Sequence, residues 1–187
     1  MQQSGEYRID ADIDAVWRAL NDPDVLRQCI DGCQSVTKIA DDAFTAAVNA
    51  RIGPLSAAFT AEIKLVDLDP PRACTMQASV KGGAAGFGKG DAKVQLTKDG
   101  AATVLRYEAE GSVGGKLAQI GQRLIDPVVR KMSDDFFSKF GAIVAGPDGA
   151  AASAVAAASP TANSKAIWIV GAVALVAAAA IALLLLK

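Results

Sequence analysis

Cysteine is the residue type in this sequence whose spacing first suggests chemistry. The three cysteines are Cys29, Cys33 and Cys74. The Cys29-x-x-x-Cys33 spacing could serve a redox pair or a metal ion, but a tetrahedral zinc site takes four ligands. An odd number of cysteines does not form a complete disulfide framework. We therefore expect small buried thiols, with a reactive or metal-binding role as the alternative.

The candidates for acid/base chemistry are few, because the sequence contains no histidine. Its absence removes the usual general base, the commonest metal ligand and the Ser-His or Cys-His pair of nucleophilic enzymes. Asp134-Asp135 is more typical of a solvated helix face than of a catalytic pair. Tyr107 is the best inward-facing candidate, and a packed core residue is its simpler interpretation. We therefore expect a protein that is not an enzyme and has no metal or catalytic site.

A glycine-rich stretch, "GAAGFGK" at residues 83–89, has the G-x-x-x-x-G-K spacing of a phosphate-binding loop. Such a loop continues with Ser or Thr and a helix, whereas Gly90 and a strand pattern follow here. The glycines are better explained by a bulge, by sheet curvature or by close approach of a ligand. Phe87 alternates to the outward face, where it could contact a membrane or partner or act as a gate. The formal net charge of -1 argues against a nucleic-acid partner.

The periodicity of apolar residues predicts the elements that carry these side chains. A strand at residues 5–11 precedes two short helices at 13–20 and 23–30, which Asp12 and Asp22 should cap. Further strands are expected at about 34–40, 43–52, 55–67, 73–81, 87–97 and 102–113. A helical pattern over 116–144 contains Pro127, where we expect a kink, and Asp126 could cap its second half. The fold class is α+β, with a curved antiparallel sheet of about seven strands wrapped on one long C-terminal helix.

The inward positions of the sheet are unusually small, because about half of them are Ala or Gly. Interiors normally pack to crystal-like density, so either large residues elsewhere close the space or a pocket remains. The alternative is a helix that sits closer to the sheet. A pocket would hold an apolar guest, and its expected lining consists of Trp17, Phe44, Val48, Ala57, Phe59, Ala61, Ile63, Met76, Ala78, Gly88, Gly90, Ala92, Leu105, Tyr107, Leu117, Ile120, Leu124, Val128, Met132 and Phe136.

The C-terminal part differs in composition from the rest. Residues 1–145 form the expected domain, 146–164 an Ala/Ser/Pro-rich flexible linker, and 165–187 a membrane anchor. About 21 apolar residues in a helix span roughly 31 Å, the thickness of a bilayer core. Trp168 and Lys165 should lie at its interface. The N-terminus has no signal-peptide pattern, so we expect a cytoplasmic domain and a single-pass C-terminal anchor in the cell inner membrane.

Three stretches carry a resemblance to a known family. They are "DIDAVWRALNDPDVLRQCIDGCQSV", "GFGKGDAKVQL" and "GGKLAQIGQRLIDPVVRKMSDDFFSKF". Over about residues 4–142 the sequence resembles the CoxG family of CO dehydrogenase subunits, which belongs to the START-like, SRPBCC helix-grip superfamily. The resemblance implies a helix-grip fold with an apolar cavity. It also implies association with a molybdenum-containing dehydrogenase such as aerobic CO dehydrogenase, and carriage of a respiratory quinone.

Residues and resemblance together predict a membrane-anchored, non-enzymatic carrier of a lipophilic molecule. Menaquinone or ubiquinone is the candidate ligand, and no covalently bound cofactor is expected. The first alternative is a structural recruiter or assembly factor that holds the dehydrogenase at the membrane without a ligand. A less favoured alternative is an enzyme that acts on an apolar substrate.

Overall fold

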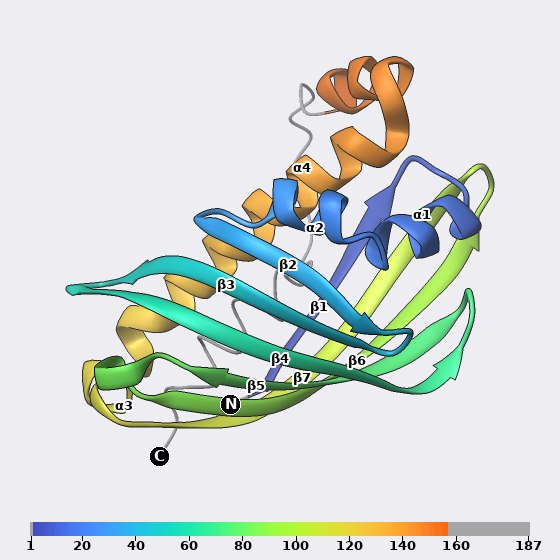
Figure 1. Ribbon diagram of the computed structural model, residues 1–187. Helices are drawn as coiled ribbons and strands as arrows, with labels where there is room; N and C mark the ends of the chain where they lie inside the picture. Colours follow the sequence, from blue (N-terminus) through green and yellow to red (C-terminus); the bar gives the residue numbers. More distant parts are fainter. Residues whose placement is uncertain (1, 157–187) are drawn as a thin grey trace.

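The computed structural model describes residues 2–156 of the 187-residue chain. A single seven-stranded antiparallel sheet curves around one long helix (Figure 1). The strands are β1 (Gln2–Ile9), β2 (Cys33–Ala40), β3 (Ala43–Ile52), β4 (Leu55–Asp69), β5 (Ala73–Lys81), β6 (Phe87–Asp99) and β7 (Ala102–Gly114). The helices are α1 (Ile13–Leu20), α2 (Pro23–Cys29), α3 (Lys116–Ile120), α4 (Gln122–Ala156) and the 3-10 helix η1 (Gly83–Ala85).

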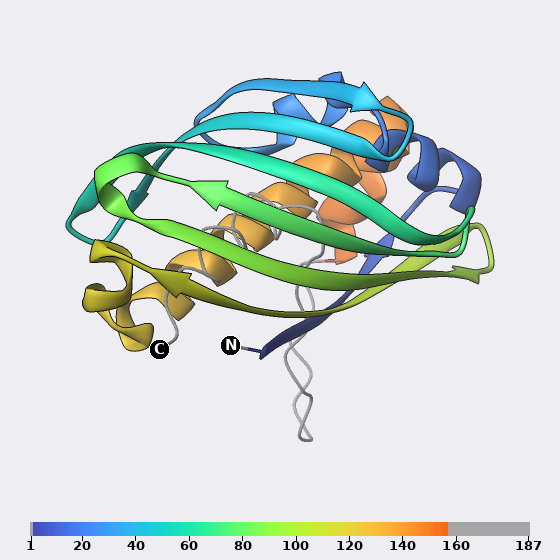
Figure 2. The ribbon, with the colours of Figure 1, turned by 60° about the horizontal axis from the view of Figure 1, so that its bottom comes forward.

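The strand order is β1-β7-β6-β5-β4-β3-β2, so the six strands after α2 form a continuous meander. The last strand, β7, pairs with the first strand, β1. This arrangement confirms the predicted order of elements and the α+β fold class. Consecutive turns alternate between the two ends of the sheet, because every neighbouring pair is antiparallel. Figure 2 shows α4 crossing the concave side of this sheet.

The two short helices begin where the sequence predicts. The Asp12 carboxylate accepts hydrogen bonds from the backbone N–H groups of Asp14 and Ala15, each at 3.0 Å. Asp22 accepts from the N–H of Asp24 at 2.9 Å, and Pro23 occupies the first helical position. These bonds satisfy donors that a helix N-terminus otherwise leaves free. They fix the residues at which α1 and α2 begin.

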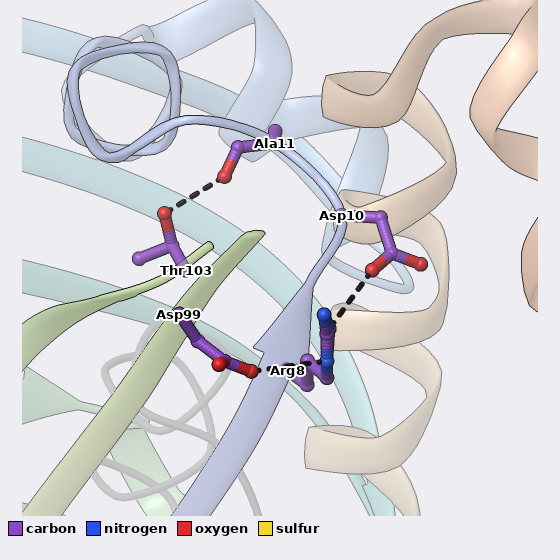
Figure 3. Close-up of polar contacts among 5 residues, drawn as sticks. All are labelled: Arg8, Asp10, Ala11, Asp99 and Thr103. Atoms are coloured by element: carbon purple, nitrogen blue, oxygen red, sulfur yellow. Dashed lines mark hydrogen bonds and ion pairs between the residues drawn. The ribbon is translucent and has the colours of Figure 1, made fainter. Parts of the chain in front are cut away.

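The end of β1 is tied to the β6–β7 turn by polar contacts (Figure 3). The fully buried Thr103 hydroxyl donates to the Ala11 carbonyl oxygen at 2.8 Å. The exposed Arg8 guanidinium lies 3.3 Å from both Asp10 and Asp99. The buried hydrogen bond contributes more than the exposed ion pairs, because water screens the latter. This network fixes the point at which the chain leaves the sheet for α1.

The predicted faces of the strands are confirmed by burial. Along β4, Phe59, Ala61 and Leu65 are buried, whereas the alternate positions from Ser56 to Lys64 are exposed. The same alternation occurs in β3, β5, β6 and β7. A slip of one residue would turn every apolar side chain to water, so this pattern fixes the register.

The C-terminal helix differs from the prediction in where it breaks. Gly121, with φ +84° and ψ 145°, separates α3 from α4, and the backbone stays helical through Pro127. A restart at Asp126 is therefore wrong. The break shifts the phase of the apolar stripe, so Ile125 and Val129 are buried. Leu124, which the prediction placed in the stripe, is 58% exposed.

An aromatic cluster packs the middle of α4 against the sheet. Phe136, Phe137 and Phe140 are buried, and their ring centroids lie 5.0–6.1 Å apart. The Tyr7 ring of β1 stacks on Phe137 at 3.9 Å. Aromatic rings bury large areas, so this cluster anchors the helix to the first strand.

The backbone after the aromatic cluster is interrupted at Gly146 and is helical again to Ala156. Within residues 2–156, no helix has the length and apolar character needed to cross a membrane. The expected anchor at 165–187, with Lys165 and Trp168, lies outside the described residues, as does the last part of the expected linker, 157–164.

Candidate functional site

An apolar pocket lies between the two short helices and strands β2–β5. Its volume is about 50 Å³. Every side chain in its wall is apolar, and the wall is formed by Leu20, Leu26, Ile30, Val36, Phe44, Ala46, Ala61, Ile63, Leu65 and Met76. The floor residues on the sheet are mostly buried, whereas Leu20, Ile30 and Val36 at the rim are half-buried. The pocket is therefore closed below and accessible above.

The hollow exists because two alanines lie side by side on the inward face of neighbouring strands. Ala46 of β3 and Ala61 of β4 are direct cross-strand partners, and Phe44–Ile63 is the next inward pair. Opposed side chains normally meet at this spacing, but two methyl groups leave space between the strands and the helix above. Small inward residues therefore leave an apolar hollow here, beneath α1 and α2 and not beneath the long C-terminal helix as expected. Among the described side chains, none from α4 lines it.

Helix α2 covers the pocket with Leu26 and Ile30. Its C-terminal end is pinned to the sheet at Gly32, whose φ is +72° and whose carbonyl accepts the Asn49 N–H at 2.9 Å. A Cβ at Gly32 would lie 2.1 Å from the Asn49 carbonyl oxygen, so only glycine allows this approach. An exposed ion pair between Asp31 and Lys139 joins the same end to α4. The C-terminal end of α2 is thus held mainly at Gly32, because the exposed ion pair adds little.

The predicted lining residues fall into four groups. Phe44, Ala61, Ile63 and Met76 lie in the pocket wall. Others are buried in the surrounding core, namely Val48, Phe59, Gly88, Ala92, Leu105, Tyr107, Leu117 and Phe136. A third group is half-buried, namely Trp17, Ala57, Ala78, Gly90, Ile120, Val128 and Met132. Leu124 points to solvent, which corrects its assignment to the interior.

The residues that the prediction missed come mainly from the first half of the chain. Leu20, Leu26, Ile30 and Val36 form the helical side and rim of the pocket. Three of them belong to the predicted short helices and Val36 to the predicted strand at 34–40, but the long C-terminal helix was expected to supply the opposite wall. The pocket faces α1 and α2 because these helices connect β1 to β2 at opposite edges of the sheet. They therefore cross one face of the sheet, and their contacts with α4 place them on the face that α4 covers.

The buried titratable groups are poorly suited to nucleophilic or acid/base chemistry. Burial raises the pKa of the Tyr107 hydroxyl, which is 3% exposed, and nearby Arg130 opposes this shift only in part. Burial also raises the pKa of Cys29 and of Cys74 to about 11 and raises that of Cys33. All three cysteines are free. A raised pKa leaves little thiolate near neutral pH.

Two larger hollows, of about 420 and 610 Å³, open on the outer face of the sheet. They are lined by polar side chains of both signs from β1, β6 and β7, including Lys89, Asp91, Lys93, Glu108 and Glu110. Within residues 2–156, no cluster of three or more Cys, Asp or Glu side chains has the geometry of a metal site. We therefore regard the smaller apolar pocket as the candidate site, because its wall has one consistent chemical character.

Solved structures share this fold. A conserved protein from Geobacillus kaustophilus is 31% identical, with a TM-score of 0.72 and coverage of 78% of this chain and 95% of that one. A protein from Chromobacterium violaceum is 14% identical, with a TM-score of 0.60 and coverage of 78% and 98%. The Zhui aromatase/cyclase from a Streptomyces species is 14% identical, with a TM-score of 0.54 and coverage of 77% and 93%.

Sequence comparisons identify the family. A comparison with curated proteins gave no match. Residues 5–145 match the CoxG family, which is described as a subunit of carbon monoxide dehydrogenase. This match spans the sheet, both short helices and α4 up to the break at Gly146. The chain therefore belongs to the CoxG family of carbon monoxide dehydrogenase subunits and has the START-like fold of the SRPBCC superfamily.

Proposed function

We propose that this protein is a non-enzymatic carrier that binds a lipophilic molecule under α1 and α2 and presents it to a molybdenum-containing dehydrogenase. The observation that carries the proposal is the pocket wall, in which every side chain is apolar. Membership of a family named for a subunit of carbon monoxide dehydrogenase supports the choice of partner.

The chemistry of the wall favours an isoprenoid or similar chain as the bound group. Burial of apolar surface is favourable by roughly 25 cal/mol per Å², whereas a polar group without a partner is penalised in such a site. A respiratory quinone, menaquinone or ubiquinone, combines such a chain with the redox chemistry that a dehydrogenase requires. The predicted anchor at 165–187 would keep the carrier beside the bilayer that stores this quinone.

The pocket must enlarge to hold a complete ligand of this kind. Ligand sites usually measure about 300 Å³ or more, whereas this one measures about 50 Å³. The present volume admits only the end of an apolar chain, so uptake of the rest requires α2 to move away from the sheet. The Asp31–Lys139 ion pair resists this movement little, because both side chains are about half exposed and such pairs contribute at most about 1 kcal/mol. Because Gly32 is held against Asn49, we expect α2 to move about this point.

The test is to identify what the protein carries. The full chain is purified from membranes, bound lipids are extracted, and the extract is analysed by mass spectrometry. We expect a quinone in stoichiometric amounts. Ala61→Leu, which fills the pocket, should remove it, whereas Ala58→Leu on the exposed face of the same strand should not. Wild-type protein that contains no lipid and does not bind quinone analogues would contradict the proposal.

A structural recruiter without a ligand is the second candidate, and the small volume of the pocket favours it. The two functions differ in their response to the same variants. If the protein only recruits the dehydrogenase, deletion of residues 166–187 should release the enzyme into the soluble fraction. Ala61→Leu should then leave electron transfer to the membrane unchanged. A carrier should lose electron transfer in both variants.

A further inference from the structure

The two ends of the sheet differ sharply in charge. At one end lie the β3–β4 turn, the β5–β6 loop with η1, and the β7–α3 connection with the start of α4 (Figure 1; Figure 2). We call this end, residues 50–56, 80–90 and 112–125, the basic tip. These segments contain no Asp or Glu, and their cations are Arg51, Lys81, Lys89, Lys116 and Arg123, all exposed.

The opposite end is acidic. The β1–α1, β2–β3, β4–β5 and β6–β7 connections there contribute Asp10, Asp12, Asp41, Asp42, Asp67, Asp69 and Asp99. Several cations at that end are engaged by these carboxylates, as in the Arg72–Asp69 pair at 2.8 Å. At the basic tip only Lys81 forms an ion pair with a described residue, Glu62 at 3.0 Å. The side chains of Arg51, Lys116 and Arg123 are exposed to solvent, and Lys89 shares a hollow on the outer face with Asp91 and Glu110.

Two large apolar side chains project from the same end. Phe87 and Leu124 are each 58% exposed. The Phe87 ring lies over the backbone of Gly114, where a Cβ would come within 2.6 Å of its Cζ atom. A Cβ on Gly86 would likewise lie 2.1 Å from the Gly114 carbonyl oxygen, so the two connections are in close backbone contact. The Phe87 ring is thus supported by closely packed backbone of the β5–β6 loop and the end of β7.

The β3–β4 turn and α3 complete the tip. A Cβ on Gly53 would lie 3.9 Å from a methyl group of Ile120, so the turn and the helix are adjacent. Helix α3 also contacts η1 and β7. The exposed apolar residues and the cations therefore belong to one contiguous surface that three connections form together.

We propose that the basic tip docks on a membrane surface that contains anionic lipids, with Phe87 and Leu124 entering the interface. Exposed aromatic and aliphatic residues surrounded by cations match the boundary between acyl chains and anionic headgroups. The excess of cations over acids in the three segments supplies the charge complementarity, and the acidic end faces away from the bilayer. The inference extends the proposed carrier function, because it states how the domain is oriented when it meets the bilayer.

In the docked orientation, the membrane contact and the pocket lie at different ends of the sheet. The pocket floor at Phe44 and Met76 lies in the half of the sheet nearer the acidic end, since both residues are close to turns at that end. Docking by the tip therefore leaves α2 and the pocket turned toward the aqueous side, where a soluble dehydrogenase can reach them. Docking itself requires no ligand.

The test places a fluorophore at the tip of the full chain. Phe87→Trp is introduced into a Trp17→Phe/Trp168→Phe background, so that residue 87 carries the only indole. The chain is reconstituted in vesicles that contain brominated phosphatidylglycerol or, in parallel, brominated phosphatidylcholine. We expect blue-shifted and strongly quenched emission in the anionic vesicles and weak quenching in the neutral ones. A tryptophan at Ile39, which is 61% exposed near the acidic end, should stay unquenched in both.

Charge reversals supply the matched control. Each cation near an anionic leaflet changes the docking equilibrium roughly fivefold, so replacing Lys116 and Arg123 by Glu should reduce it by at least about 25-fold. Lys64→Glu/Lys98→Glu, away from the tip, should have little effect. Unquenched emission from residue 87 in anionic vesicles, equal quenching after the tip reversal, or a response only to added dehydrogenase would overturn the proposal. Because no ligand is present, these outcomes do not depend on whether the carrier function is correct.

Discussion

Replacing Ala61 by Val should stabilise the protein, because the added carbons enter existing space. Ala61 is 4% exposed and faces the pocket together with its partner Ala46. Two added carbons at about 0.8 kcal/mol each give at most about 1.6 kcal/mol. For a domain of this size that corresponds to a rise of about 3–6 °C in Tm.

The matched control for this substitution is Ala92→Val. Ala92 is also 4% exposed, and it faces inward from β6 between Met76 and Ala109 without lining the pocket. Overpacking at such a position costs about 1–3 kcal/mol, so its Tm should fall by about 2 °C or more. Thermal unfolding of both variants by circular dichroism makes the comparison. Equal destabilisation of the two variants would contradict this prediction, because it would show that no usable space exists beside Ala61.

Three further predictions concern other parts of the fold. Thr103→Val should lower the free energy of unfolding by about 1–3 kcal/mol in denaturant titrations, because it leaves the Ala11 carbonyl unpaired in a buried site; an unchanged value would contradict the assigned hydrogen bond. Gly86→Ala should lower Tm, because φ is +126° and the new Cβ meets a backbone oxygen; a neutral effect would mean that the tip is loosely packed. Folding raises the pKa of Cys29 and Cys74 from 9.0 to about 11. The protonated thiols therefore stabilise the fold below about pH 9, and this contribution is lost as pH rises toward 11. Unfolding midpoints should fall more steeply over this range than in a variant with Ala at both positions.

The sheet could be predicted from sequence because its signals are local. Alternating apolar and polar residues in segments such as 55–65, with turn residues between the segments, predicted both the strands and their faces, and the burial pattern agrees. Helix starts were equally clear, since Asp12 and Asp22 are strong N-caps. Each of these features depends on interactions within a few residues.

The site was harder to predict because it depends on contacts distant in sequence. Two alternative breaks were available in the last helix, at Gly121 and at Pro127. Proline near the start of a helix loses only one hydrogen bond, whereas Gly121 adopts a left-handed conformation that ends α3. That choice changed which side of α4 faces inward and left Leu124 exposed. The pairing of β1 with β7, which brings α1 and α2 over the concave side, left no local signal.

Photoaffinity labelling can show whether the pocket beneath α1 and α2 receives an isoprenoid chain. The full chain is incubated with an isoprenoid probe that carries a terminal diazirine, irradiated, digested and mapped by mass spectrometry. We expect adducts on the pocket wall, at Phe44, Ile63, Met76 or Leu26. The Ala61→Leu substitution should abolish them, whereas Ala58→Leu should not. Adducts confined to other surfaces, or labelling that is unchanged in Ala61→Leu, would show that the pocket beneath α1 and α2 does not receive the ligand.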